Sequence, residues 1–126
     1  MRKIIQSHGA PAPIGPYSQA VMHNNVLFIS MQIAIDPESG LLIEKGMKEM
    51  TVRIMENIGN ILKEAEMGYE DITMTSLYLA DIHDFAEVNE VYGSYFTGNF
   101  PARETMQIAC LPKNARLAIS AVAMKA

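Results

Sequence analysis

The sequence has no tryptophan, a single cysteine and few charged residues. Cys110 alone cannot form an intrachain disulfide, which favours a reducing compartment. Ten Lys and Arg residues stand against fourteen Asp and Glu, the net charge is −4, and no basic run is longer than Arg2-Lys3. Because proteins that bind nucleic acid through its phosphates need clustered cations, we expect no nucleic-acid partner.

Long apolar runs are also missing. No run approaches the roughly 18 residues of a membrane span, and the first residues lack the charged-then-apolar layout of a signal peptide. We therefore expect a cytoplasmic protein with no membrane partner. The three histidines have no metal-ligand spacing, and no glycine-rich phosphate loop or Ser-His-Asp pattern is present.

Apolar residues make up 49% of the 126 positions, enough for one compact domain that spans residues 1–126. The Pro- and Gly-rich stretch 9–16 predicts an irregular lead-in. Hydrophobic periodicity and turn residues predict strands at 17–21, 26–33, 72–79, 102–109 and 115–124. They predict helices at 47–65 and from 84 to about 97, the second with Asp84 and Glu87 as a capping box. The order ββαβαββ indicates a two-layer α+β sandwich, a mostly antiparallel sheet with both helices on one face.

Alternation along the strands predicts two faces of the sheet. The face toward the helices would carry Leu117, Ile119, Ala121 and Ala123, together with Met31. The opposite face would carry neutral polar residues and one arginine: Ser30, Gln32, Arg103, Thr105 and Gln107. Such a face is typical of a half-buried oligomer interface with a pocket, and the alternative is an ordinary solvated sheet.

Five segments together resemble one family. They are the stretches 12–20 (APIGPYSQA), 28–33 (FISMQI), 84–92 (DFAEVNEVY), 101–105 (PARET) and 111–113 (LPK). In their order and spacing they are similar to the motifs of the reactive intermediate deaminase A family, also called the RidA, YjgF or L-PSP endoribonuclease-like family.

The resemblance implies a chorismate-mutase-like or ferredoxin-like sheet, and a homotrimer whose sheets form a central barrel. A small-molecule site would lie in each cleft between neighbouring subunits. The implied activity is that of a 2-iminobutanoate/2-iminopropanoate deaminase, which hydrolyses reactive imines and enamines to 2-keto acids and ammonia without a metal or organic cofactor. A ribonuclease role is disfavoured here by the net charge of −4.

The resemblance also assigns residues to the site. Arg103 would hold the carboxylate of a 2-imino or 2-keto acid through paired hydrogen bonds; the alternative is a surface arginine on an edge strand. Tyr17 would line the cleft and form one hydrogen bond, or else pack in an interface. Thr105 would contribute its hydroxyl or backbone groups, and these three residues are the candidate catalytic groups. Three further positions would bind substrate or shape the pocket: Ser30, Met31 and Asn89. For Ser30 and Asn89 the alternative is local structural hydrogen bonding.

The sequence departs from the family pattern in the last strand and in the second. Ala118 stands where most members carry a glutamate thought to orient the attacking water, and Ser120 replaces a second glutamate. Loss of a general base lowers a rate by about 10²–10⁴, and strand parity places Ala118 on the same face as Arg103. Met31 replaces the usual glycine. Two functions remain open: a deaminase with reduced activity, and a non-catalytic module that binds a small keto acid.

Overall fold

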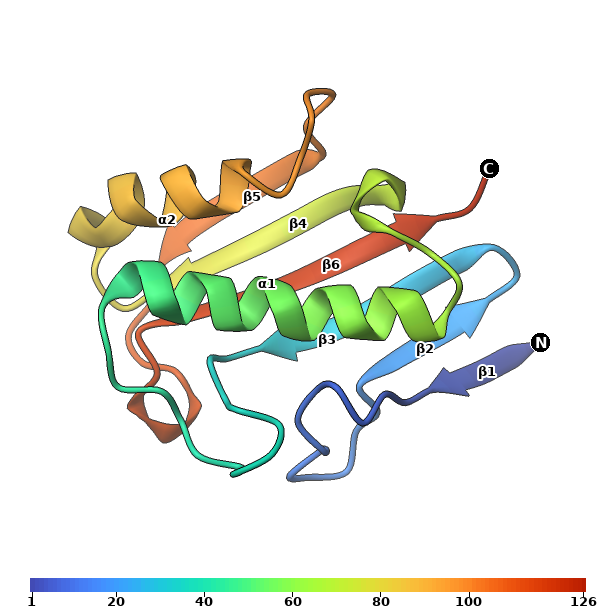
Figure 1. The fold of residues 1–126 in the computed structure, drawn as a ribbon, viewed down its shortest axis with the longest axis horizontal. Coiled ribbons are helices and arrows are strands. Elements are labelled where there is room, and N and C mark those ends of the chain that lie inside the picture. The colour runs from blue at the N-terminus through green and yellow to red at the C-terminus, as the bar shows by residue number, and fades with distance from the viewer.

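The computed structural model describes residues 1–126 as a mixed α+β fold, in which both α helices lie on one face of a six-stranded sheet (Figure 1). The helices are α1 (Met47–Glu64) and α2 (Phe85–Gly93). The strands are β1 (Arg2–Ile5), β2 (Ala20–His23), β3 (Val26–Gln32), β4 (Ile72–Leu79), β5 (Ala102–Gln107) and β6 (Leu117–Met124). Their order in the sheet is β1-β2-β3-β6-β4-β5, and only the β4–β5 pair is parallel.

The α+β class and the mostly antiparallel sheet are confirmed, but the predicted order lacks one strand. β1 pairs with β2, and Arg2 lies opposite His23. Three of its four residues are exposed, and so short a segment shows no alternation that sequence analysis can detect. It is a strand because β2 offers it a free edge, which is a tertiary effect.

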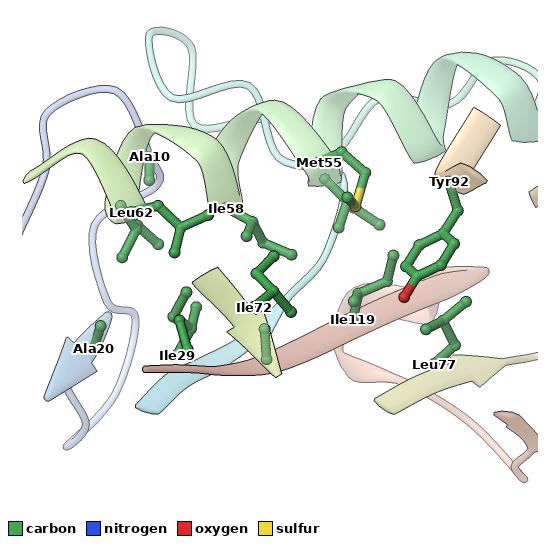
Figure 2. Close-up of a cluster of buried hydrophobic side chains, with 14 of the residues drawn as sticks. Ala10, Ala20, Ile29, Met55, Ile58, Leu62, Ile72, Leu77, Tyr92 and Ile119 are labelled. Carbon is green, nitrogen blue, oxygen red and sulfur yellow. The ribbon is translucent and has the colours of Figure 1, made fainter. Parts of the chain in front are cut away.

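Helix α1 contributes seven of the 24 residues of the main core, more than any other element. In Figure 2, Met55, Ile58 and Leu62 point from the helix toward Ile29 and Ile119 of the sheet. All three helix residues are fully buried. Full burial of such a side chain stabilises a fold by about 1.5–3 kcal/mol, so the amphipathic stripe fixes α1 to the sheet. No helix combines the length and the apolarity needed to cross a membrane.

Helix α2 begins where the sequence predicts, but the predicted capping box is wrong. Asp84 makes no side-chain cap; its Oδ2 instead accepts a hydrogen bond from Arg116 Nη2 at 3.1 Å. Asp81 accepts from the backbone N–H of His83 at the start of the preceding 3₁₀ turn. The helix also ends earlier than predicted, at Gly93. The capping pattern gave a wrong prediction because the Asp84 carboxylate binds Arg116 instead of the helix N-terminus. Arg116 is 32 residues away in the sequence and comes close to Asp84 only when the chain folds.

The predicted parity of β3 fails after Ile29 because the strand contains a bulge. Ile29 pairs with Ala121 and Gln32 with Ile119, so three steps on β3 oppose two on β6. The extra residue reverses the faces of the sheet toward which the later side chains point. Met31 is consequently 41% exposed instead of entering the core. Ile33 belongs to a second, smaller cluster that also contains Ala118.

Strand β5 faces the opposite way from the prediction. Thr75 pairs with both Arg103 and Ala121, and Ala121 belongs to the main core beneath the helices. Paired residues share a face, so Arg103 and Thr105 lie on the helix side of the sheet. Neither face of β5 is apolar throughout, so its own sequence does not reveal which one is covered. In β6 the apolar face is clear, and the prediction for Leu117, Ile119, Ala121 and Ala123 is confirmed.

Candidate functional site

Arg103 is held in place by helix α2. Its guanidinium carbon lies 5.2 Å from the ring centroids of both Phe85 and Tyr92. Its Nη1 donates a hydrogen bond to Asn89 Oδ1 at 2.7 Å. All three partners are on α2, so the helix and the edge strand together fix the direction of the cation. Two of the candidate site residues, Arg103 and Asn89, are thus in direct contact.

The guanidinium has no carboxylate partner within the chain. The ion pairs of the structure involve Lys48, His83 and Arg116, and none includes Arg103. A half-buried cation is costly unless an anion or good hydrogen-bond acceptors compensate it. One of its five N–H groups is used by Asn89, which leaves donors for a planar anion such as a carboxylate.

A cavity of about 320 Å³ opens beside this arginine. Its lining is Asn89, Tyr92, Gly93, Phe100, Pro101 and Arg103. Burial raises the pKa of Tyr92 above its ordinary value, and its hydroxyl lies 2.7 Å from Thr75 Oγ1. The phenol is therefore neutral at physiological pH, and Arg103 is the one charged group of the lining.

Thr105 lies two residues farther along β5 and carries an unpartnered group. Its Oγ1 is buried and has no hydrogen-bond partner in the chain. Leaving a buried hydroxyl unsatisfied costs about 1–3 kcal/mol. Thr105 does not line the Arg103 cavity. Neither that cavity nor a hydrogen bond within the chain therefore accounts for its buried hydroxyl.

Tyr17, Ser30 and Met31 meet in a second cavity, of about 390 Å³. The remaining lining is Pro11, Ala12, Ile14, Gln19, Gln32, Ile33, Ile35 and Pro112. Tyr17 Oη accepts a hydrogen bond from the backbone N–H of Ile14 at 3.3 Å, which leaves its own proton to donate. Ser30 Oγ donates to the carbonyl of Ser18 at 2.7 Å. No Asp, Glu, Lys or Arg side chain lines this cavity.

Gln19 shapes the second cavity and was missed as a site residue by sequence reasoning. It is 2% exposed, and its Oε1 accepts from the backbone N–H of Ser7 at 2.7 Å. Its Nε2 donates to the carbonyls of Ser7, Ala10 and Pro11 at 3.0, 3.2 and 2.9 Å. The backbone carbonyls of an irregular Pro-rich segment have no partners in a helix or sheet and need other hydrogen-bond donors. A side-chain amide close in sequence, such as that of Gln19, was the signal from which this role could have been predicted.

The two cavities are separate within one chain. Arg103 belongs to β5, whereas Ser30 and Met31 belong to β3, and β6 and β4 intervene. Three strand spacings amount to about 14 Å, and the cavities share no lining residue. Five of the six predicted site residues therefore lie at two cavities, which we call the cationic half-site (Arg103, Asn89) and the apolar half-site (Tyr17, Ser30, Met31). Thr105 lines neither of them.

Ala118 belongs to neither half-site. It is fully buried in the small apolar cluster with Ile33, Ile35, Leu111 and Ala115. Because β6 alternates, it lies on the face opposite to Arg103, which corrects the prediction that the two share a face. Ile33 and Ile35 also line the Tyr17 cavity, so Ala118 lies beneath the wall of that half-site.

The fold is a small α+β domain with one cationic and one apolar cavity. Comparisons with known proteins give the family. The family model described as Endoribonuclease L-PSP matches residues 7–125. The human 2-iminobutanoate/2-iminopropanoate deaminase is 46% identical over 125 residues, which cover 99% of this chain and 91% of the human protein.

Solved structures agree with this match. RidA from the Antarctic bacterium Psychrobacter sp. has a TM-score of 0.94 at 36% identity, with 98% of this chain and 99% of that one covered. TdcF of E. coli with bound serine has a TM-score of 0.94 at 34% identity and the same coverage. The chain belongs to the RidA/L-PSP endoribonuclease family, as its five sequence segments predict.

Proposed function

We propose that this protein hydrolyses reactive 2-imino acids to 2-keto acids and ammonia. The observation that carries the proposal is Arg103, a half-buried guanidinium that is fixed by Asn89 and two aromatic rings but has no carboxylate partner. A 2-imino acid supplies that carboxylate. The relatives named as deaminases, with 45% and 46% identity over almost the whole chain, support the same reaction.

We propose further that the complete site forms between two copies in a homotrimer, where Arg103 of one copy faces the Tyr17 cavity of the next. Both half-sites are open in a single chain and about 14 Å apart across the sheet. The sheet also exposes large apolar side chains: Phe28, Met31 and Met106 are 52%, 41% and 37% exposed. An apolar surface of this kind favours burial against a second copy.

The chemistry needs little more than positioning. Arg103 binds the carboxylate, and the Tyr17 hydroxyl donates to the imine nitrogen. Water then adds to the C=N carbon, the π electrons move to nitrogen, and the proton that the water loses is taken up by nitrogen to give a neutral carbinolamine. The carbinolamine hydroxyl then passes its proton to the amino group, and the keto C=O bond forms as the C–N bond breaks and ammonia leaves. Because imines hydrolyse readily in water, orientation and fixed dipoles can accelerate the step without a dedicated base.

Ala118 favours a second candidate function, the binding of a small 2-keto acid without turnover. No carboxylate lines either cavity, and loss of a general base lowers a rate by about 10²–10⁴. Arg103 would hold a keto acid as well as an imino acid, because both present the same carboxylate.

One assay separates these functions. A threonine dehydratase generates 2-iminobutanoate in situ, and the release of 2-ketobutyrate is followed with and without this protein. We expect acceleration by the wild type and a loss of about a hundredfold in Arg103→Ala, since hydrogen bonds to a charged group contribute about 1.5–3 kcal/mol each. Arg2→Ala, which removes an exposed arginine remote from both cavities, is the matched control.

An Arg103→Ala protein as fast as the wild type would contradict the proposal. Binding of 2-ketobutyrate by a wild-type protein that gives no acceleration would instead establish the keto-acid module.

A further inference from the structure

The cavity that contains Tyr17 is larger and more apolar than a two-carbon side chain requires. At about 30 Å³ for each water-sized group, its 390 Å³ holds on the order of ten non-hydrogen atoms. The relatives' names specify imines with methyl or ethyl side chains. Such small groups would leave most of this cavity to water.

The walls have the chemistry of a hydrocarbon pocket. Ile14, Met31, Ile33 and Ile35 surround it together with prolines and Ala12, and no Asp, Glu, Lys or Arg side chain is present. The polar groups that line it are largely occupied: Ser30 Oγ donates to a backbone carbonyl, and Gln19 is bound on both ends of its amide. The polar groups that remain for the reacting group are the proton of Tyr17 and the amide of Gln32, whose only hydrogen bond runs from Nε2 to the carbonyl of Ser30 at 3.3 Å.

Two features of this chain make the cavity apolar. The bulge in β3 places Met31 at its wall, 41% exposed, where a side chain contacts whatever enters. Ala118 packs against the cluster that contains the wall residues Ile33 and Ile35, and its side chain is a methyl group. The layer beneath this wall is therefore apolar and contributes no carboxylate. Met is unbranched and adapts to irregular apolar partners.

We infer that the imino-acid site of this protein selects 2-imino acids with large apolar side chains, branched aliphatic or aromatic, with Met31 and Ile14 as specificity-determining walls. The inference rests on the proposed function, because Arg103 must hold the carboxylate while the side chain enters the Tyr17 cavity. Each additional methylene in an apolar pocket is worth about 1–3 kcal/mol, or about 10–200-fold in kcat/KM. We expect a preference of at least about tenfold over 2-iminobutanoate.

The test uses one imine generator for all substrates. An L-amino acid oxidase with catalase converts 2-aminobutyrate, leucine or phenylalanine to the corresponding imine, and keto-acid release is followed with and without the protein. Calorimetry measures the affinity of the matching keto acids, a readout that does not need turnover. We expect the leucine- and phenylalanine-derived compounds to be hydrolysed faster and bound more tightly.

Ile14→Asp places a carboxylate at the cavity, and we expect it to abolish the preference for the larger compounds. Leu41→Asp is its matched control, because Leu41 is 69% exposed against 63% for Ile14 and lies outside the cavity. Neither exposed side chain is needed for the core, so both variants should fold.

The outcomes distinguish this inference from the proposed function. Hydrolysis of 2-iminobutanoate with no gain, or a loss, for the larger imines would overturn the selectivity and leave the deaminase intact. The same result is expected if a neighbouring copy fills the cavity. No hydrolysis of any imine, with tighter binding of the larger keto acids, would overturn the deaminase and keep the selectivity.

Discussion

At the scale of single residues, Ala118 has the greatest consequence. Its side chain is fully buried, and its neighbours are Ile33, Ile35, Leu111 and Ala115. A carboxylate at this position would enter an apolar cluster instead of an open cleft. The small cluster and the alanine therefore fit one another, and a glutamate cannot be introduced here without a change in the surroundings.

Ala118→Glu should lower the free energy of unfolding by about 3–5 kcal/mol, because a carboxyl group without a partner would be buried, either charged or forced to keep its proton. Burial raises the folded pKa of the introduced carboxyl above its unfolded value of about 4.3. Above that pH the unfolded chain releases the proton while the folded chain retains it, so stability is lost as the pH rises. Urea titrations at about pH 5 and about pH 8 should show the larger deficit at the higher pH.

Ala102→Glu, at an exposed position of β5, is the control and should change stability by less than about 0.5 kcal/mol. A small, pH-independent loss in Ala118→Glu would show that the new carboxylate reaches solvent or a partner, and that this wall opens readily.

At the scale of elements, helix α1 carries a constraint that its amphipathic pattern does not reveal. The Tyr69 side chain packs against the surface of the helix at Gly59, and its hydroxyl donates a hydrogen bond to the carbonyl of Met55 at 2.8 Å. A Cβ at Gly59 would contact the Tyr69 hydroxyl and lie 2.8 Å from its Cζ. Burial raises the pKa of Tyr69 well above its ordinary value, so the hydroxyl remains a donor.

Gly59→Ala should therefore destabilise the protein by about 1–3 kcal/mol, the usual cost of overpacking. Elsewhere in a helix the same substitution stabilises by up to about 1 kcal/mol. Gly93→Ala is the control, because Gly93 lies in α2 and nothing would approach its Cβ within 4 Å. If thermal unfolding shows both variants to be more stable than the wild type, the contact between α1 and Tyr69 does not constrain this position.

At the scale of the whole molecule, the separation of the half-sites makes assembly testable by function. Arg103→Ala retains an intact Tyr17 cavity, and Tyr17→Ala retains an intact Arg103. If each complete site combines residues of two copies, unfolding and refolding the two inactive variants together should restore part of the activity. Each variant refolded alone should remain inactive. Sedimentation of the wild type should show a trimer at micromolar concentration.

Arg103→Ala removes one positive charge, so ion-exchange chromatography can separate mixed trimers from trimers of either variant alone. If isolated mixed trimers recover no activity, both half-sites function within one copy. A stable monomer that hydrolyses imines would have the same meaning, and the shared site would be withdrawn.

The sequence by itself determined the α+β class, both helices, most strands and the covered face of β6, because these depend on local periodicity and turn residues. It also determined the family, and with it the residues Arg103, Tyr17, Ser30, Asn89, Thr105 and Met31 as candidates. Of these, the contact between Arg103 and Asn89 and the grouping of Tyr17, Ser30 and Met31 are found in the structure.

The tertiary structure alone decided how those candidates are arranged. β1 forms because β2 offers an edge, and the carboxylate of Asp84 binds Arg116 instead of capping α2. The bulge between Ile29 and Gln32 arises only where β3 is paired with β6, and it turns Met31 outward. The direction of β5 likewise depends on its register with β4. Pairing between distant strands has no signature within either strand, which is why parity predicted the residues of the site but not the sides of the sheet on which they lie.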